Sequence, residues 1–288
     1  MRNERKEIIL LTRADDMGYT HTGNLAILDC LRRGIIRSAA ILVVAPWFEE
    51  AAQIARENPD LCFGVHLGII GEWRGYRWRP VLPYSEVRTL VDEDGFLWKS
   101  PAQFWEHDPS MAELEREFRA QIDLARKKGL RVDYVDSHYF MPYDPKFRPI
   151  LERIGKDYEV PISCLLGEHE LDDFGIYSPA PEEKERVLAQ ILQDLKPGVH
   201  LLIGHPGYPS LENDALVHFE PKDVQTLGVG RNRAAETLAY TSPRIQRLVA
   251  DLGIKLMSYR EFCAREDLPS RQTRDCSEVK HEQGKTGD

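Results

Sequence analysis

Short apolar runs alternate with longer amphipathic stretches along most of this chain, and no other feature constrains the fold as strongly. Brief runs rich in Leu, Ile and Val are typical of strands that are buried on both faces. The predicted strands are residues 7–12, 35–44, 61–67, 132–136, 161–164, 199–204 and 254–258.

The stretches between these runs repeat apolar residues every three or four positions, as helices with one buried face do. Strands that alternate with helices form parallel sheets. Seven or eight such units in 288 residues predict an α/β fold, a (β/α) barrel-like domain of mostly parallel strands related to the TIM barrel. An open dinucleotide-binding sheet is disfavoured because no G-x-G-x-x-G motif follows the first strand. The clearest helical faces carry Leu114, Phe118, Ile122 and Ala125, then Val187, Leu188, Ile191, Leu192 and Leu195, then Ile245, Leu248, Val249 and Leu252.

The predicted organisation is a single catalytic domain over residues 1–264. Two stretches, 68–110 and 205–240, are too long for ordinary connections and follow strand ends, where barrels place their binding loops. Residues 265–288 are polar and charged, so we expect a disordered tail there.

The composition argues against several classes of protein. A formal net charge of −9 provides no basic surplus for binding nucleic acid or an anionic membrane surface. No apolar stretch approaches the roughly 18 residues that span a bilayer, and the N-terminus does not resemble a secretory signal, so we expect a cytoplasmic protein. The five cysteines are scattered and form no C-x-x-C pair, which argues against disulfides and a structural zinc site.

Ionisable residues stand at the ends of four predicted strands, and they are the Asp15-Asp16 pair, His66, His138 and His205. Each has an ordinary structural alternative, which is an exposed acidic turn for the pair and a packed core residue for each histidine. The carboxyl ends of parallel strands face one rim of a barrel. Their joint placement therefore favours a shared site over four unrelated positions.

Two adjacent carboxylates at a strand end repel each other unless a positive charge lies beside them. A divalent cation would relieve that repulsion, with one acid as its ligand and the other free to act as a general base. Asp136 stands two residues before His138 and could hold a neighbouring ligand through a hydrogen bond, or cap a turn.

These motifs together resemble those of the YdjC-like (ChbG/HpnK) carbohydrate deacetylases, over roughly residues 8–261. The order and spacing of the pieces carry the resemblance, since none of them is specific alone. The matching pieces are Arg13-Ala-Asp-Asp-Met-Gly18, Gly64-Val-His-Leu67, Asp136-Ser-His138, His205-Pro-Gly207, and Arg233-Ala-Ala-Glu236 followed by Ser242-Pro.

The resemblance implies a hydrolase that removes acetyl groups from N-acetylated sugars and holds one divalent metal ion. The implied ligands are Asp16, His66 and His138. Asp15 would be the base that activates water, and His205 an acid or a partner of the oxyanion. One carboxylate with two imidazoles suits zinc, manganese, cobalt or iron, and the resemblance makes magnesium plausible as well. The implied supporting or substrate-binding residues are Asp136, Tyr139, Arg233 and Glu236, with Arg233 and Glu236 as an ion pair near the rim.

The chain departs from the family pattern after His138, where further histidines usually follow and Tyr139-Phe140-Met141-Pro142 stands here. Tyr139 could stack on a sugar ring, or the change could indicate a different acyl substrate. The expected partner is a small carbohydrate substrate. The sequence leaves open whether the chain forms a homodimer.

The stretch 68–110 is rich in aromatic residues, which favours either a sugar-binding lid or a small core beneath a long loop. Two rival functions remain at this stage. A related hydrolase of a phosphoester or a non-sugar amide would use a cationic rim, for which Arg74, Arg77 and Arg79 are candidates. A non-catalytic sugar-binding protein would have little need of both Asp15 and Asp16. The aromatic cluster on which this expectation rests consists of Trp73, Tyr76, Trp78, Phe96, Trp98 and Trp105.

Overall fold

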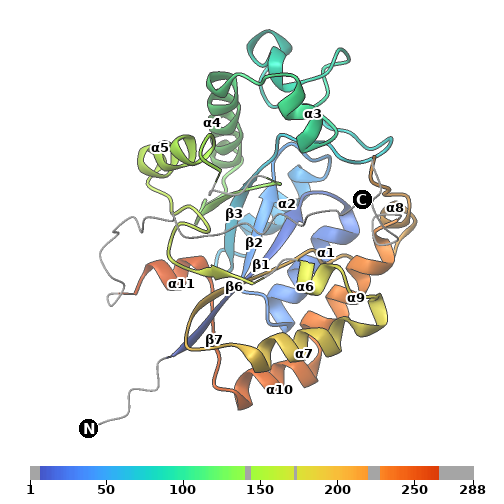
Figure 1. The fold of residues 1–288 in the computed structure, drawn as a ribbon, viewed down its shortest axis with the longest axis vertical. Coiled ribbons are helices and arrows are strands. Elements are labelled where there is room, and N and C mark those ends of the chain that lie inside the picture. The colour runs from blue at the N-terminus through green and yellow to red at the C-terminus, as the bar shows by residue number, and fades with distance from the viewer. Residues whose placement is uncertain (1–6, 140–143, 172–173, 220–227, 266–288) are drawn as a thin grey trace, which may run out of the picture.

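The computed structural model describes residues 7–139, 144–171, 174–219 and 228–265. One seven-stranded sheet forms its centre, in the order β4-β3-β2-β1-β6-β5, with β7 paired to β1 (Figure 1). Every pair of these strands is parallel, which confirms the predicted α/β class. The strands are β1 (Ile8–Met17), β2 (Ser38–Leu42), β3 (Cys62–Leu67), β4 (Val135–Ser137), β5 (His169–Glu170), β6 (Gly198–Gly204) and β7 (Lys255–Met257).

Helices connect the strands and cover the outside of the sheet, with α4 and α5 at one end and α7, α9 and α10 at the other (Figure 1). The helices after the first three strands are α1 (His21–Arg33), α2 (Phe48–Glu57), α3 (Pro101–Glu106) and α4 (Met111–Lys127). The remaining helices are α5 (Arg148–Tyr158), α6 (Phe174–Tyr177), α7 (Lys184–Asp194), α8 (Leu211–Asp214), α9 (Gly230–Thr241), α10 (Pro243–Asp251) and α11 (Tyr259–Cys263).

Strand β1 is the centre of the sheet because it pairs with three other strands. Its residues 8–14 pair with β6, while residues 9–11 pair with β7 and residues 13–17 with β2. Since a strand has only two edges, β7 and β2 share one of them. All of β1 from Ile9 onward is buried.

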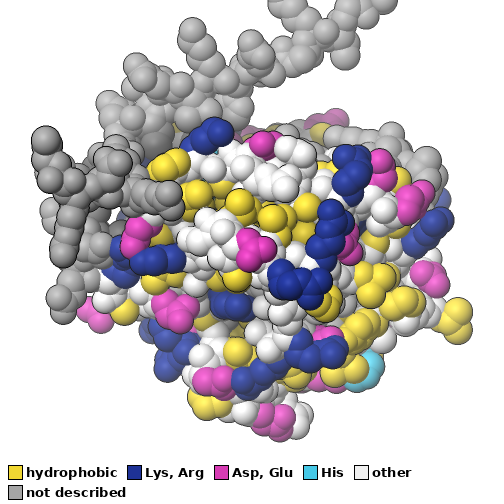
Figure 2. Space-filling model, turned by 90° about the horizontal axis from the view of Figure 1, so that it is seen from below, with side chains coloured by type: hydrophobic (Ala, Val, Ile, Leu, Met, Phe, Trp, Pro, Cys, Tyr) yellow, Lys and Arg dark blue, Asp and Glu magenta, His cyan; other side chains and the backbone are white. Residues whose placement is uncertain are grey.

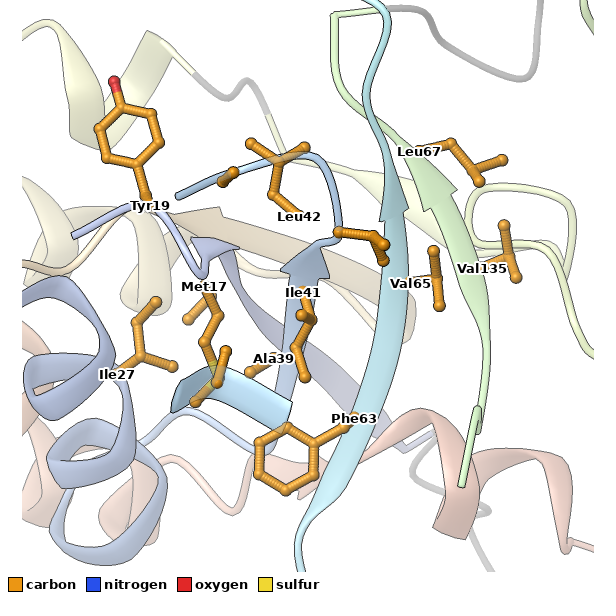
Figure 3. Close-up of a cluster of buried hydrophobic side chains, with 14 of the residues drawn as sticks. Met17, Tyr19, Ile27, Ala39, Ile41, Leu42, Phe63, Val65, Leu67 and Val135 are labelled. Carbon is orange, nitrogen blue, oxygen red and sulfur yellow. The ribbon is translucent and has the colours of Figure 1, made fainter. Parts of the chain in front are cut away.

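Alternate residues of the strands divide the core into two layers. The outer layer lies between the sheet and the helices, where Met17, Ala39, Ile41, Phe63 and Val65 pack together (Figure 3). The inner layer fills the concave side of the curled sheet, where the rings of Tyr134 and Tyr259 stack with centroids 4.3 Å apart. Gly64 is required there, because a Cβ atom at this position would lie 2.5 Å from the Tyr134 ring. The inner layer includes Ile9, Leu11, Ala40, Cys62, Leu201 and Ile203.

The alternation continues past the apolar residues to the carboxyl ends of the strands. The inner positions of each strand lead in steps of two residues to a polar side chain at the rim. The series are Ile9, Leu11, Arg13 and Asp15 in β1; Cys62, Gly64 and His66 in β3; Tyr134, Asp136 and His138 at β4; and Leu201, Ile203 and His205 at β6. The curled sheet therefore directs these polar groups toward one another above its apolar interior.

The helix predicted from Leu114, Phe118, Ile122 and Ala125 is confirmed as α4, and all four side chains are buried. It begins where the Ser110 side chain accepts a hydrogen bond from the backbone N–H of Glu113, a common helix cap. The predicted helical faces around residues 187–195 and 245–252 correspond to α7 and α10.

Several elements differ from the prediction. The strand expected at 161–164 is reduced to one bridge between Ile162 and Val135, and the chain then turns at Cys164, whose φ is 69°. The stretch 205–240, which was expected to be a long binding loop, contains α8 and α9. The sequence did not predict α9 because its buried face is largely polar and shows no apolar period. Apart from residue 265, the expected tail lies outside the described residues.

The surface carries charges of both signs. On the face shown in Figure 2, basic and acidic side chains are interspersed with apolar ones. Within the described ranges, no helix has the length and apolar character needed to cross a bilayer. Cys30, Cys62 and Cys164 are buried and Cys263 is exposed, and none of these four forms a disulfide.

Candidate metal centre

Three ligand atoms from separate strands converge at the rim. Asp16 Oδ1 lies 3.5 Å from His66 Nε2 and 3.4 Å from His138 Nδ1, and the two imidazole nitrogens are 3.1 Å apart. All three residues are buried, and Asp16 Oδ1 has no hydrogen-bond partner. The three residues that the resemblance implied as metal ligands are therefore brought together.

Asp16 reaches this point through an unusual backbone conformation. By the alternation of β1 it would face the outer layer, but its φ is 64°, in the left-handed region. Asp and Asn enter this region more readily than other residues with a side chain. The pairing register between β1 and β2 shifts between Ala14 and Met17, and Gly18 follows with a φ of 101°. This local turn brings the Asp16 carboxylate to the inner side.

A carboxylate orients each histidine. His66 Nδ1 lies 2.9 Å from Asp136 Oδ2, and His138 Nε2 lies 3.2 Å from Glu72 Oε2. Each imidazole can donate this outer N–H to its carboxylate and direct the other nitrogen toward Asp16. Metal-binding histidines are commonly held in this way.

This donor set fits a divalent cation. Ligands at about 2.1 Å from a tetrahedral cation would stand about 3.4 Å apart, close to the separations found here. The second oxygen of Asp16 accepts a hydrogen bond of 2.6 Å from Arg233 Nη2, so only Oδ1 remains available. Asp16, His66 and His138 would therefore hold the ion.

The buried charges shift the pKa values of these groups in opposite directions. Burial alone would raise the pKa of Asp16, but Arg233 and the nearby histidines hold it well below its usual range. Burial alone would lower the pKa of His66, yet the carboxylates of Asp136, Asp15 and Asp16 raise it to about 9. A cation bound at His66 would have to displace a proton.

Asp15 belongs to an adjoining ionic network rather than to the ligand triangle. Arg13 Nε and Nη2 bind its two carboxylate oxygens at 2.6 and 2.8 Å. The same guanidinium lies 3.0 Å from Asp136 and 2.5 Å from the Ser163 hydroxyl, which contacts Tyr259 at 2.5 Å. Asp15, His66 and Asp136 form a second group whose ligand atoms lie close together. Arg13 is the counterion of its two carboxylates.

His205 ends β6 on the same rim but has different neighbours. Its backbone N–H donates to Glu236 at 2.7 Å, its Nδ1 has no partner, and its ring lies 5.6 Å from that of Tyr177. Burial lowers the pKa of His205 to about 4, with a further contribution from the charge of Arg233. The imidazole is therefore neutral near pH 7 and must receive a proton before it can donate one.

Arg233 and Glu236 support different parts of the site instead of each other. Arg233 binds Asp16, whereas Glu236 lies 3.5 Å from Lys184 Nζ and accepts from the backbone of His205. The side chains of Lys184 and Glu236 are both fully buried. Lys184 also donates to the carbonyl of Tyr177 at 2.9 Å, so it joins α7 to the segment beside His205.

Two of the aromatic residues of 68–110 belong to the core, as one of the two interpretations expects. Trp73 and Trp78 are buried beside Tyr19, with ring centroids 5.2 and 5.6 Å away, and belong to the core. Tyr139, outside this stretch, is 44% exposed and packs edge-on against His138 at 4.6 Å. Phe140, Met141 and Pro142 lie outside the described residues.

The three arginines proposed for a cationic rim have other contacts. Arg77 pairs with Asp92 at 2.8 Å, and the Arg79 guanidinium lies 4.1 Å from the centre of the Phe96 ring. Arg74 reaches the carbonyl of Phe219 at 3.4 Å. Each of the three guanidiniums is therefore engaged by other groups of the described chain.

Sequence reasoning missed Glu72 and Lys184. Glu72 is the single acid in the run Leu67-Gly-Ile-Ile-Gly-Glu-Trp73, and a buried acid after a strand end was the available signal. Lys184 gave no signal, because it opens an amphipathic helix in a charged stretch where exposed lysines are common.

Comparisons with known proteins point to one family. A family model described as YdjC-like protein matches residues 9–251. A carbohydrate deacetylase of Brevibacillus brevis is 26% identical over 266 residues, which cover 88% of this chain and 99% of that protein. The carbohydrate deacetylase of Geobacillus stearothermophilus is 26% identical over 259 residues, covering 88% and 97%.

One solved structure supports the fold directly. It is a crystal structure from Enterococcus faecalis V583 of a protein provisionally assigned to cellobiose-phosphate cleavage. It superimposes with a TM-score of 0.73 at 25% sequence identity, over 89% of this chain and 99% of that one. The family resemblance and the barrel-like fold predicted from the sequence are thereby confirmed.

Proposed function

Because this chain belongs to the YdjC-like family, we propose that it is a metal-dependent hydrolase that removes acetyl groups from N-acetylated amino sugars or short oligosaccharides. The observation that carries the metal dependence is the convergence of Asp16, His66 and His138, with two carboxylates orienting the imidazoles. The substrate class follows the relatives, which are carbohydrate deacetylases.

Asp16, His66 and His138 would hold one divalent ion, with magnesium or zinc favoured and manganese or cobalt as alternatives. When bound, such a cation would polarise the acetyl carbonyl and make a water molecule more acidic. Arg233 keeps one oxygen of Asp16 engaged and so fixes which oxygen faces the histidines.

Asp15 is the proposed base. Arg13 binds both of its oxygens, but a carboxylate has about four acceptor positions and can still accept a proton from water. The bidentate contact with Arg13 fixes the direction of the carboxylate, as general base catalysis requires.

His205 is the proposed partner of the leaving amine. Since its pKa is lowered to about 4, it begins as a neutral acceptor. It would donate a proton to the sugar nitrogen only after gaining one during the reaction. Glu236 fixes its backbone, and Lys184 neutralises Glu236.

Acetate release from N-acetylglucosamine and its oligomers tests the proposal. The protein is assayed as purified, after treatment with a chelator, and after separate addition of zinc, magnesium, manganese or cobalt. We expect the chelator to remove the activity and one of the metals to restore it. We also expect Asp15→Asn to abolish the activity without loss of metal. No acetate from any acetylated sugar would overturn the substrate class, and activity unaffected by the chelator would overturn the metal dependence.

Three features expected from the sequence stay predictions. They are the single catalytic domain over residues 1–264, the cytoplasmic location and the homodimer. None is needed for the chemistry proposed here.

A further inference from the structure

An exposed tryptophan stands on the rim beside the metal centre. Trp47 directly precedes α2 and is 37% exposed. Its backbone N–H donates to the carbonyl of Gly18 at 2.8 Å, two residues after the candidate ligand Asp16. The indole is therefore attached to the turn that leaves the metal centre.

Polar contacts fix the orientation of this indole. Its Nε1 donates to Glu212 Oε1 at 2.7 Å, and its ring lies 5.3 Å from that of His21 at an interplanar angle of 40°. His21 is bound to Glu50 at 2.7 Å, and Asn24 donates both to Glu50 and to the carbonyl of Trp47. A large exposed aromatic side chain held in one orientation loses little conformational entropy when a ligand packs on it.

A second aromatic ring contacts the same turn. The hydroxyl of Tyr76 donates to the carbonyl of Tyr19 at 2.6 Å, three residues after Asp16, and its side chain is partly buried. Burial raises the pKa of Tyr76, and the negative charge of Glu212 adds to this effect.

Four connections build this cluster, and each follows a different strand. His21 follows β1, Trp47 follows β2, Tyr76 follows β3 and Glu212 follows β6. In a parallel barrel-like sheet these connections gather at the carboxyl-terminal rim, where the metal centre lies. The cluster therefore borders the proposed active site.

We propose that Trp47 and Glu212, with Tyr76 beside them, form an outer subsite for a second sugar ring of an N-acetylated oligosaccharide. This inference rests on the proposed function, because the acetylated ring must lie at the metal centre. The C–H groups of a pyranose can pack on the indole face. Glu50 and Glu212 provide acceptors for the hydroxyl groups at the ring edge, whereas their negative charges disfavour a nucleic acid or another anionic ligand.

The test compares kcat/KM for a trisaccharide and a monosaccharide of N-acetylglucosamine. Trp47→Ala should lower the ratio of the two values by about tenfold, as the loss of one aromatic contact predicts. Trp47→Phe should restore most of the ratio, because it keeps an aromatic face. Tyr84→Ala is the matched control, since Tyr84 is also exposed but lies outside this cluster. An equal loss on both substrates in Trp47→Ala would overturn the subsite.

A binding measurement separates this proposal from the proposed function. Titration calorimetry with the fully deacetylated trisaccharide reports on the subsite without any acetate release. If Trp47→Ala weakens binding about tenfold, the subsite is supported even when no acetylated sugar is hydrolysed. The absence of hydrolysis would then overturn only the proposed deacetylase activity. Unchanged binding of this trisaccharide would overturn the subsite even if acetate is released.

Discussion

Two histidines lie at strand ends on the same rim, and their pKa values move in opposite directions. His66, on β3, has a pKa raised to about 9, whereas His205, after β6, has a pKa lowered to about 4. Burial disfavours the charged form of both and is the largest single influence on each pKa. At His66 the surrounding carboxylates outweigh it, whereas at His205 they do not.

The neighbours of His66 are carboxylates, and Asp136 binds its Nδ1 directly. Near His205, the negative charges of Asp16 and Asp15 are opposed by the positive charges of Arg233 and His66, and Glu236 is engaged by Lys184 and by a backbone N–H. The first region therefore favours a charged imidazole and the second a neutral one. In the proposed mechanism, the first region would bind the cation and the second would transfer a proton.

The largest expected effect, on both metal content and turnover, comes from a change in the region of His66, at Asp16. Asp16→Ala removes one of three ligands and leaves the buried Arg233 without its partner. We expect loss of bound metal, measured by elemental mass spectrometry, and a fall in turnover of about a thousandfold or more. The exposed residue Asp123, changed to Ala, serves as the control. Normal metal content in Asp16→Ala would contradict the ligand assignment.

The next effect belongs to the other region. His205→Gln should lower kcat by about a hundredfold, as for the loss of a general acid or base, while metal content stays at the wild-type level. Together with Asp16→Ala, this variant separates proton transfer from metal binding. Metal lost together with turnover would place His205 among the ligands, and unchanged turnover would remove it from the mechanism.

A smaller effect is expected for the residues that orient the histidines. Glu72→Gln replaces the carboxylate that accepts from His138, and metal affinity should fall by about tenfold to a hundredfold. Asp136→Asn tests the corresponding position at His66. Affinity is measured by competition with a chelating dye. An affinity equal to that of the wild type in both variants would show that the imidazoles need no such support.

The smallest expected effect is the change in metal affinity over one pH unit. His66 keeps a proton below about pH 9, and a cation must displace it. Metal affinity should therefore fall as the pH is lowered through this value, by up to about tenfold per unit. Calorimetry in buffers of different ionisation enthalpy should detect about one released proton per bound ion near pH 7. An affinity independent of pH below 9 would contradict the raised pKa.

The period of two residues explains why so much of the site could be predicted. The inner positions of the four strands continue in steps of two to Asp15, His66, His138 and His205, respectively. The positions of the strand ends were therefore enough to predict these residues. Asp16 breaks this period, since only its left-handed backbone conformation turns it inward. The pattern could identify the acidic pair but could not decide which acid faces the histidines, and the family resemblance supplied that choice.

Long-range polar contacts could not be predicted. Glu72 and His138 are 66 positions apart, and Arg233 and Asp16 are 217 apart, with no apolar period to relate them. The family resemblance implied that Arg233 pairs with Glu236. In the structure, α9 directs Arg233 toward Asp16 and Glu236 toward Lys184. Short polar strands such as β5 gave no signal for the same reason.

The central place of β1 ties the metal centre to the stability of the whole domain. This strand carries Asp16 and is paired along both edges, so its amide hydrogens should be among the slowest to exchange with solvent. Asp16 stands two residues beyond the part of β1 that pairs with β6, in the turn where the pairing with β2 is irregular, so the most protected part of the sheet anchors its position. A cation that binds only the folded chain should therefore raise the melting temperature above that of the chelated protein.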